Sequence, residues 1–478
     1  MICFTEFIKS SWLKASVLTL LAGCMLGPEY NRPESYGLTS AAFTSTSTLE
    51  EQQHAGARWW ENYNDPVLND WVAQLAAENL DLKAIAERTI QAQERVAIQR
   101  GALWPAIGIS GEGVRGFSPS LVDSSARSYA TDVNVGAGIS WQMDLFGRTR
   151  SAVEAAEYSA LASATDYQAL LHVLIAELVS QRAGLSVLNR EIQIQEDIVG
   201  NRTQTLDTVS RRYRLGVKST SAVGVYTARE NITSARAELI FLQQRQLETM
   251  LIIDVLLNQR PGTLKPLESP FPELPPARIP EIDTPAALLD RRPDIVGSEL
   301  RLMAANAGIG IAIADLYPDL TISANRGFRS DELGGLLKNN NAVGFLAGQI
   351  TARLFEGGRL RAQIRLRESE ARELTLQYAG TVLTAMAEVE TALVQERYLR
   401  QQVDQRRAST TAARHAETLA QQRYQRGITS LLEVLETQRR RRNAERNLLI
   451  TQRASWQARV NLHLALGGDW LGIPGTQG

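Results

Sequence analysis

The sequence predicts a mainly α-helical protein with a β-barrel portion, built from a helix-strand-strand-helix unit that occurs twice. Of its 478 residues, 44% are hydrophobic but only 6% are aromatic, and Ala, Gln, Glu, Leu and Arg recur throughout. This composition is typical of long helices. Two further observations support this fold class: segments that occur twice in the chain, and strands in which polar and apolar residues alternate. The formal charge of −1, from 51 basic and 52 acidic residues, gives no indication of nucleic-acid binding.

The N-terminus has the pattern of a secretory signal peptide over residues 1–23. Lys9 and Lys14 precede a short apolar run, and small residues come before the predicted cleavage site. No apolar run long enough for a transmembrane helix follows residue 30.

Cys24 comes directly after Leu-Ala-Gly, an arrangement that resembles the bacterial lipobox. In such proteins the cysteine becomes the mature N-terminus and carries a covalent N-acyl and diacylglycerol lipid. We therefore expect a lipidated N-terminal segment over 24–65; the alternative is a free or buried cysteine beside an ordinary cleavage site. Met25, rather than Asp, follows the cysteine, and by resemblance to sorted lipoproteins this favours the outer membrane. Cys3 leaves with the signal, so no internal disulfide is expected.

Three segments of the first half have counterparts, in the same order, in the second half. Matched residues of the first pair lie 213 positions apart: Asp81 and Asp294, Arg88 and Arg301, Leu103 and Leu316, Pro105 and Pro318. The other pairs are "DLFGRTR" (144–150) with "RLFEGGRLR" (353–361) and "RYRLG" (212–216) with "RYQRG" (423–427). Self-similarity of this order indicates a real internal repeat.

Each repeat contains a very long stretch of helix formers. From Arg148 to about Arg212 there is no proline, and from about Gly358 to Arg426 the only internal glycine is Gly380. Helices of roughly 65 residues would be about 100 Å long and need coiled-coil-like partners along their length. The predicted divisions are a first repeat over 66–260, a Pro-rich linker over 261–285, a second repeat over 286–466 and a C-terminal tail over 467–478.

The predicted strands lie near 105–117, 131–146, 318–328 and 343–355. Residues 132–145 alternate strictly, with Val133, Val135, Ala137, Ile139, Trp141, Met143 and Leu145 on one face and Asp132, Asn134, Ser140, Gln142 and Asp144 on the other. Similarly, Leu346, Ile350, Ala352 and Leu354 oppose Ala347, Gln349, Thr351 and Arg353. Such strands suit a transmembrane barrel with a wet lumen. The alternative is a soluble sheet with one face on a core.

Four strands per chain cannot close a barrel. Open strand edges in lipid leave backbone groups unsatisfied, and small barrels need about eight strands. If these strands span a membrane, several chains must therefore pool them, and two, three or four chains all satisfy this requirement.

The motifs together resemble the TolC-like outer-membrane efflux proteins, in the lipoprotein branch that serves resistance-nodulation-division pumps. They are the lipobox, "GPEYNRP" (27–33), "RRPDI" (291–295) and the two "RYxxG" segments. The resemblance implies a homotrimer in the outer membrane of a Gram-negative bacterium, with a twelve-stranded barrel and a helical tube extending into the periplasm. It also implies a periplasmic adaptor and an inner-membrane pump as partners, and a passive exit duct for small molecules.

The resemblance assigns the two "RYxxG" segments to the periplasmic tips of the tube, where an adaptor would dock. The residues concerned are Arg212, Tyr213, Gly216, Arg423, Tyr424 and Gly427. Gly216 and Gly427 suit a tight reversal between antiparallel helices, which requires positive φ or close backbone approach. The alternative is that these are ordinary helix caps without a partner.

Past the second tip, Glu433, Glu436 and Arg439 match positions where family members place charged residues at the tunnel constriction. Glu433 and Glu436 share a helix face; in a trimer they would form a ring of six carboxylates. The alternative is a solvated helix face on which Glu436 pairs with Arg440.

No catalytic or metal-binding constellation is visible, so we expect neither an enzyme nor a cofactor other than the lipid. The four histidines are scattered without ligand spacing, and no Gly-rich phosphate loop follows a strand. Alternatives to drug efflux are the channel of a type I protein secretion system, a heavy-metal efflux channel and a periplasmic coiled-coil scaffold. No motif specifies the exported substrate.

Overall fold

The computed structural model of the protein describes residues 25–33, 43, 52–53, 58–119, 127–217, 220–266, 271–282 and 284–467. The predicted signal peptide, Cys24 and all of the predicted tail except Gly467 lie outside these residues. The chain divides into two compact units, and each draws on both repeats. The sheet unit takes the described residues within 1–34, 87–164 and 297–378; the helical unit takes those within 35–86, 165–296 and 379–478.

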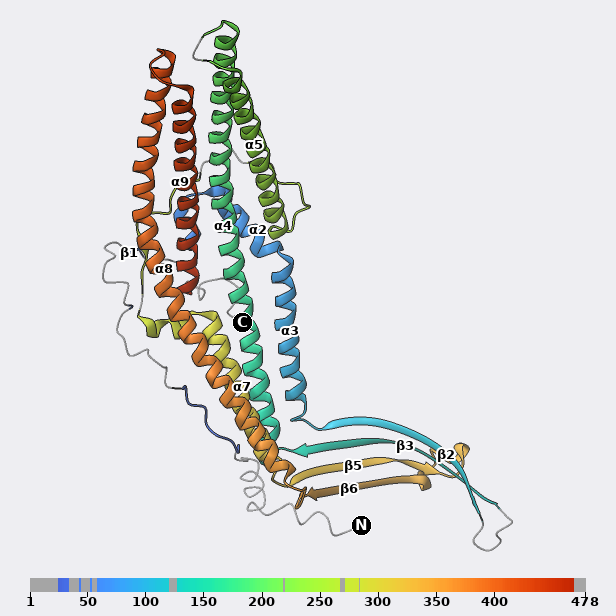
Figure 1. Ribbon diagram of the computed structural model, residues 1–478. Helices are drawn as coiled ribbons and strands as arrows, with labels where there is room; N and C mark the ends of the chain where they lie inside the picture. Colours follow the sequence, from blue (N-terminus) through green and yellow to red (C-terminus); the bar gives the residue numbers. More distant parts are fainter. Residues whose placement is uncertain are drawn as a thin grey trace. The chain divides into compact units, whose positions relative to one another are not determined.

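Long helices dominate the described chain, which confirms the predicted mainly α-helical fold class (Figure 1). They are α2 (Pro66–Glu78), α3 (Leu80–Gly101), α4 (Arg148–Arg214), α5 (Ala222–Leu256), α7 (Pro293–Ala314), α8 (Arg359–Gln425) and α9 (Leu431–Ala465). Short elements are η2 (Trp59–Tyr63), η3 (Pro285–Ala287), α6 (Leu288–Arg291), η4 (Leu333–Gly335) and η5 (Asn339–Asn341). Two-residue strands β1 (Gln52–Gln53) and β4 (Ile279–Pro280) pair in parallel.

Helices α4 and α8 occupy the same place in the two repeats and have the same length, 67 residues each. At 1.5 Å per residue each is about 100 Å long. Within the helical unit, α4 lies antiparallel to α5 and α8 lies antiparallel to α9 (Figure 1). One window of α4 is long and apolar enough to cross a membrane, but 67% of that window is buried, as in a core helix.

The core of the helical unit is aromatic and includes part of the segment predicted as a linker. Tyr63 and Phe271 pack on Trp456 with ring centroids 4.9 and 4.7 Å away. Arg459 donates hydrogen bonds to the carbonyls of Pro276 and Arg278. These contacts therefore hold the proline-rich segment in the core. Its prolines explain why it is not a long helix, but no local pattern shows what it packs against.

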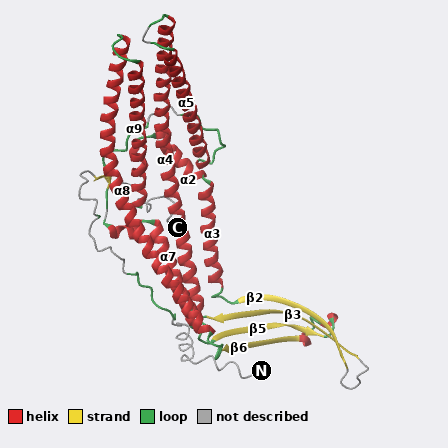
Figure 2. Ribbon diagram, viewed as in Figure 1, coloured by secondary structure: helices red, strands yellow, loops and turns green. Residues whose placement is uncertain are grey.

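The sheet unit contains four antiparallel strands in the order β2-β3-β5-β6 (Figure 2). Their bounds are β2 (Ala106–Pro119), β3 (Arg127–Met143), β5 (Asp319–Ser330) and β6 (Ala342–Thr351). Each of the four predicted segments overlaps a strand. However, β6 ends at Thr351, before the predicted end near 355, so Leu354 lies in the connection to α8.

The register gives this sheet one mainly apolar face, which Arg115 on β2 and Arg326 on β5 interrupt. Ile107 lies opposite Ile139, which lies opposite Ala324. Directly paired residues share a face. This face also carries Ile109, Val133, Val135, Trp141, Leu320, Ile322, Phe328, Leu346 and Ile350. It is uncovered: Ile109 is 83% exposed and Leu346 79%.

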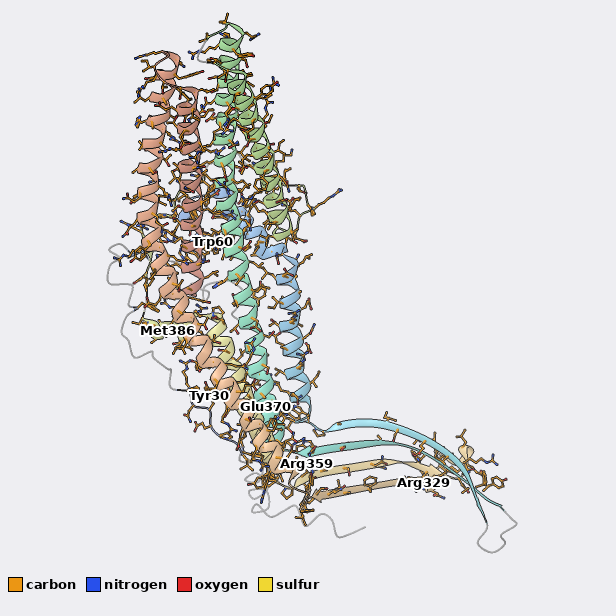
Figure 3. All side chains as sticks on the ribbon, in the orientation of Figure 1. Tyr30, Trp60, Arg329, Arg359, Glu370 and Met386 are labelled. Carbon is orange, nitrogen blue, oxygen red and sulfur yellow. The ribbon has the colours of Figure 1, made fainter. Side chains whose placement is uncertain are left out.

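The opposite face carries ion pairs and amides. Arg329 Nη2 lies 2.6 Å from the Asp132 carboxylate, and Gln142 donates to Asp319 at 3.0 Å. Figure 3 labels Arg329 on β5. Strand β6 departs from the pattern, because Val343 and Phe345 lie on this face too. The alternation predicted for β3 therefore extends across most of the sheet.

Candidate functional site: the helix tips and the first turns of α9

The two predicted tips have the same backbone geometry. Gly216 follows α4 with φ of 69° and Gly427 follows α8 with φ of 76°. Val217 N–H donates to the Arg212 carbonyl at 3.1 Å, and Ile428 N–H donates to the Arg423 carbonyl at 2.9 Å. These are Schellman caps, in which glycine takes the left-handed conformation that ends the helix. Both glycines thus have the positive φ that the sequence pattern predicts.

The side chains of the tips differ, although their sequences match. The Arg212 guanidinium lies 4.5 Å from the centre of the Tyr424 ring. Its Nη2 also donates to the carbonyls of Tyr424 and Gln425 at 3.4 Å, where the C-terminal end of α8 is electronegative. The equivalent residues Arg423 and Tyr213 are both exposed. One arginine therefore joins the two tips of a chain, and the other points into solvent.

Glu433 has a local role at the start of α9. Ser430 caps this helix by accepting the Glu433 N–H at 3.4 Å, and the Glu433 carboxylate accepts a hydrogen bond from the Thr429 hydroxyl. The sequence S-x-x-E is that of a capping box. Here the glutamate bonds to Thr429, so its carboxylate stays at the tip.

Glu436 and Arg439 are brought together. Arg439 Nη2 and Arg440 Nε each lie 2.8 Å from Glu436 Oε1. The hydrogen bond from Arg439, followed by the one from Arg440, holds the pKa of the half-exposed Glu436 at about 2. Glu436 therefore stays ionised. It pairs with Arg440, which was the alternative considered from the sequence, and also with Arg439. In a single chain its charge is compensated locally.

The described N-terminal segment is held along α7, a contact that sequence reasoning missed. Arg32 Nε lies 2.7 Å from the buried Glu299 carboxylate, to which Tyr30 also donates. Asn306 donates to the Pro28 carbonyl at 2.8 Å. Figure 3 labels Tyr30 in the sheet unit. Residues of the "GPEYNRP" motif therefore fix the chain that follows Cys24.

Buried ion pairs are a second set of residues missed from the sequence. Arg182 pairs with Asp65 at 2.8 Å, and Arg459 pairs with Glu396 at 2.6 Å. All four side chains are almost fully buried. The two members of each pair are distant in sequence, so no spacing of residues predicts the pairing.

An uncovered sheet with one apolar face, together with long antiparallel helices ending in glycine-capped tips, defines a class of outer-membrane channel proteins. The chain belongs to the outer membrane efflux protein family, whose model matches residues 71–259 and 284–468. It is an efflux channel of the Gram-negative outer membrane that extends into the periplasm.

Two relatives from Pseudomonas putida match over nearly the full chain. The probable efflux pump outer membrane protein TtgC of Pseudomonas putida is 28% identical over 473 residues, which are 97% of this chain and 96% of TtgC. The pyoverdine export outer membrane protein OpmQ of Pseudomonas putida is 29% identical, covering 92% of this chain and 94% of OpmQ.

Solved structures agree with the fold. The outer-membrane channel OprN is 26% identical with a TM-score of 0.85, covering 94% of this chain and 100% of OprN. The open state of the Neisseria gonorrhoeae channel MtrE is 25% identical with a TM-score of 0.81, covering 94% of this chain and 99% of MtrE. The family and these neighbours are channels rather than enzymes.

Proposed function

We propose that three copies of this chain form one passive exit duct for small molecules. A periplasmic adaptor and an inner-membrane pump of the resistance-nodulation-division type would deliver the cargo. The four-stranded sheet, apolar on one face and charged on the other, carries this proposal. Its outer strands β2 and β6 each have one edge without a partner strand in the described chain, and unpaired edges in lipid cost several kcal/mol per group. Three sheets give the twelve strands of one closed barrel.

Efflux of small molecules is favoured over protein secretion by the relatives. The names of these relatives include antibiotic, toluene and solvent efflux and pyoverdine export. We propose the same class of cargo here, and an adaptor that contacts the tips around Gly216 and Gly427. Glu433, Glu436 and Arg439 would line the constriction, and Cys24 would carry the lipid.

Light scattering of the full-length protein in detergent tests the duct directly. The expected mass is that of three chains, and planar bilayers should show discrete channels. In a Pseudomonas putida strain without TtgC, the protein should restore resistance to antibiotics. A monomer without conductance would overturn the proposal.

Labelling with radioactive palmitate tests the lipid separately. Cys24→Ser should abolish the label, and because the barrel can insert without the anchor, conductance should persist. Equal labelling of the parent and the variant would disprove lipidation at Cys24.

A further inference from the structure

The sheet unit contains an aromatic contact between the two repeats that occurs once among the residues that the structure describes. Phe146, from the "DLF" segment of the first repeat, stacks on Tyr317, from the second, with centroids 4.8 Å apart and planes at 27°. Both rings lie in short connections between strand and helix. This stack joins the end of β3 to the start of β5, its partner in the sheet.

The repeat supplies a second pair of rings at the equivalent positions. Trp104 corresponds to Tyr317, since each ring precedes the proline of a matched segment, and Phe355 corresponds to Phe146 in the "LF" pair. Trp104 is 75% exposed and Phe355 is 89% exposed. The first lies beside β2 and the second beside β6, the two outer strands of the sheet. Among the residues that the structure describes, neither ring stacks on another aromatic side chain.

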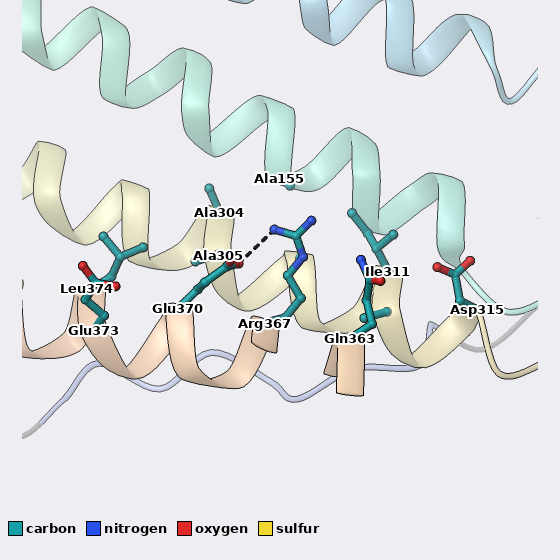
Figure 4. Close-up of a pocket in the computed structure, with 12 residues that line it drawn as sticks. Ala155, Ala304, Ala305, Ile311, Asp315, Gln363, Arg367, Glu370, Glu373 and Leu374 are labelled. Atoms are coloured by element: carbon teal, nitrogen blue, oxygen red, sulfur yellow. Dashed lines mark hydrogen bonds and ion pairs between the residues drawn. The ribbon is translucent and has the colours of Figure 1, made fainter. Parts of the chain in front are cut away.

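The helices of the sheet unit show the same difference between the two repeats, because a groove that three helices line has an equivalent that two helices line. In Figure 4, Ala155 of α4 lines a groove of about 550 Å³ whose other walls come from α7 and α8, including Ala304, Gln363 and Arg367. The equivalent groove of about 660 Å³ lies between α3 and α4, at Gln91, Ala152 and Ala156. In the described part of the chain, no third helix lines this groove.

The α3–α4 groove lacks the helix that would correspond to α4. That helix would be α8 of another copy, because α8 is the counterpart of α4. The residue equivalent to Ala155 is Leu366, which is 53% exposed on α8. A second copy placed by the relation between the repeats therefore brings Leu366 to the groove and Phe355 to Trp104.

We propose that Trp104 of each copy stacks on Phe355 of the neighbouring copy, as Phe146 stacks on Tyr317 within a chain. This inference rests on the trimer proposed above and names the contact that closes it beside the barrel. The ion pair near the internal stack, Arg148 with Asp315 at 2.8 Å, is not repeated, because Ala102 stands at the position equivalent to Asp315. The contact between copies therefore depends more on its aromatic stack than does the contact between the two repeats of one chain.

Paired cysteines distinguish the two kinds of contact. In the full-length chain, W104C with F355C and a short bifunctional thiol reagent should give products of two and three chains on denaturing gels. The matched control, F146C with Y317C, should react within one chain and keep the mobility of a monomer. The parent should give no cross-linked product.

A double-mutant comparison measures the same contact without cysteines. W104A and F355A should each lower the temperature at which the oligomer dissociates, and their combined loss should be smaller than the sum, since both remove one stack. W104A with F146A should be additive, because these rings belong to different stacks. Additivity in the first pair would overturn the proposal.

The alternative occupant for Trp104 is the lipid headgroup region, where tryptophan is enriched in membrane proteins. In that case brominated lipid would quench a component of the fluorescence that W104F removes, and W104C with F355C would not cross-link; that result overturns the stack. Light scattering separates the two proposals: a trimer without the cross-link disproves only this contact, whereas a parent monomer disproves the duct.

Discussion

The sheet unit and the helical unit contain apolar side chains of similar kinds but place them oppositely. In the helical unit, Trp456 is 1% exposed and contacts other aromatic rings. In the sheet unit, apolar residues such as Ile107 and Ile350 are about three-quarters exposed. Charges show the reverse arrangement, because the Arg459–Glu396 pair is buried while Arg329 and Asp132 lie on an open surface. The first unit is built around its own core, and the second leaves apolar side chains exposed that lipid and the other copies of the proposed trimer would cover.

The largest expected effect is the loss of a buried charge partner in the helical unit. Arg459→Leu leaves the Glu396 carboxylate without its closest cation and frees two carbonyls. Breaking a buried ion pair costs about 3–5 kcal/mol. Urea unfolding followed by circular dichroism should show this loss. Arg400→Leu is the matched control, because Arg400 contacts the same carboxylate at 3.0 Å but is half exposed; it should cost under about 1 kcal/mol. Equal losses would mean that burial does not distinguish the two arginines.

The next effect tests the two faces of the sheet. Ile139→Arg places a charge on the apolar face, at a cost of about 2–4 kcal/mol near the middle of a bilayer. Ser140→Arg should be tolerated, since Ser140 lies on the polar face. Folding into lipid vesicles, measured by heat-modifiable mobility on gels, compares the two. Similar damage from both would contradict the assignment of the faces.

The pH dependence of the helical core should be graded, and for each pH unit it should be smaller than either of these losses. His463 stacks on Trp59 at 4.4 Å, and burial, with nearby Arg459, lowers its pKa to about 3. Below pH 6.5 the unfolded chain binds a proton that the folded chain excludes. As the pH falls from roughly 6.5 to 3, His463 should therefore lower the free energy of unfolding by about 1.4 kcal/mol for each pH unit. His463→Phe keeps a ring on Trp59 and should remove this slope. An unchanged slope in urea titrations at several pH values would exclude His463 as its source.

The smallest effect on stability is expected at the exposed carboxylates of α9. Glu433→Ala with Glu436→Ala should leave the unfolding midpoint unchanged. Six carboxylates around a narrow axis would attract cations, so the double variant should lower cation selectivity in planar bilayers, most clearly at low salt. The control is Glu230→Ala with Glu248→Ala, which removes the same charge from exposed positions of α5. If both double variants conduct alike, the constriction lies elsewhere.

The sequence by itself determined the features that depend on local period and backbone conformation. Alternation in β3 predicted its two faces, the absence of proline predicted α4 and α8, and the glycines Gly216 and Gly427 predicted a positive φ at the tips. Each of these follows from a pattern within one continuous segment of the chain. The internal repeat also indicated which segments correspond.

Only the tertiary structure decided which distant residues meet. Trp456 packs on Phe271, Arg459 pairs with Glu396, and Arg212 contacts Tyr424 while its sequence equivalent Arg423 stays exposed. Two copies of one motif have different surroundings because a single chain supplies neighbours for one copy but not for the other. Local sequence fixes what a residue can bind; the packing of helices far apart in the chain fixes what it does bind.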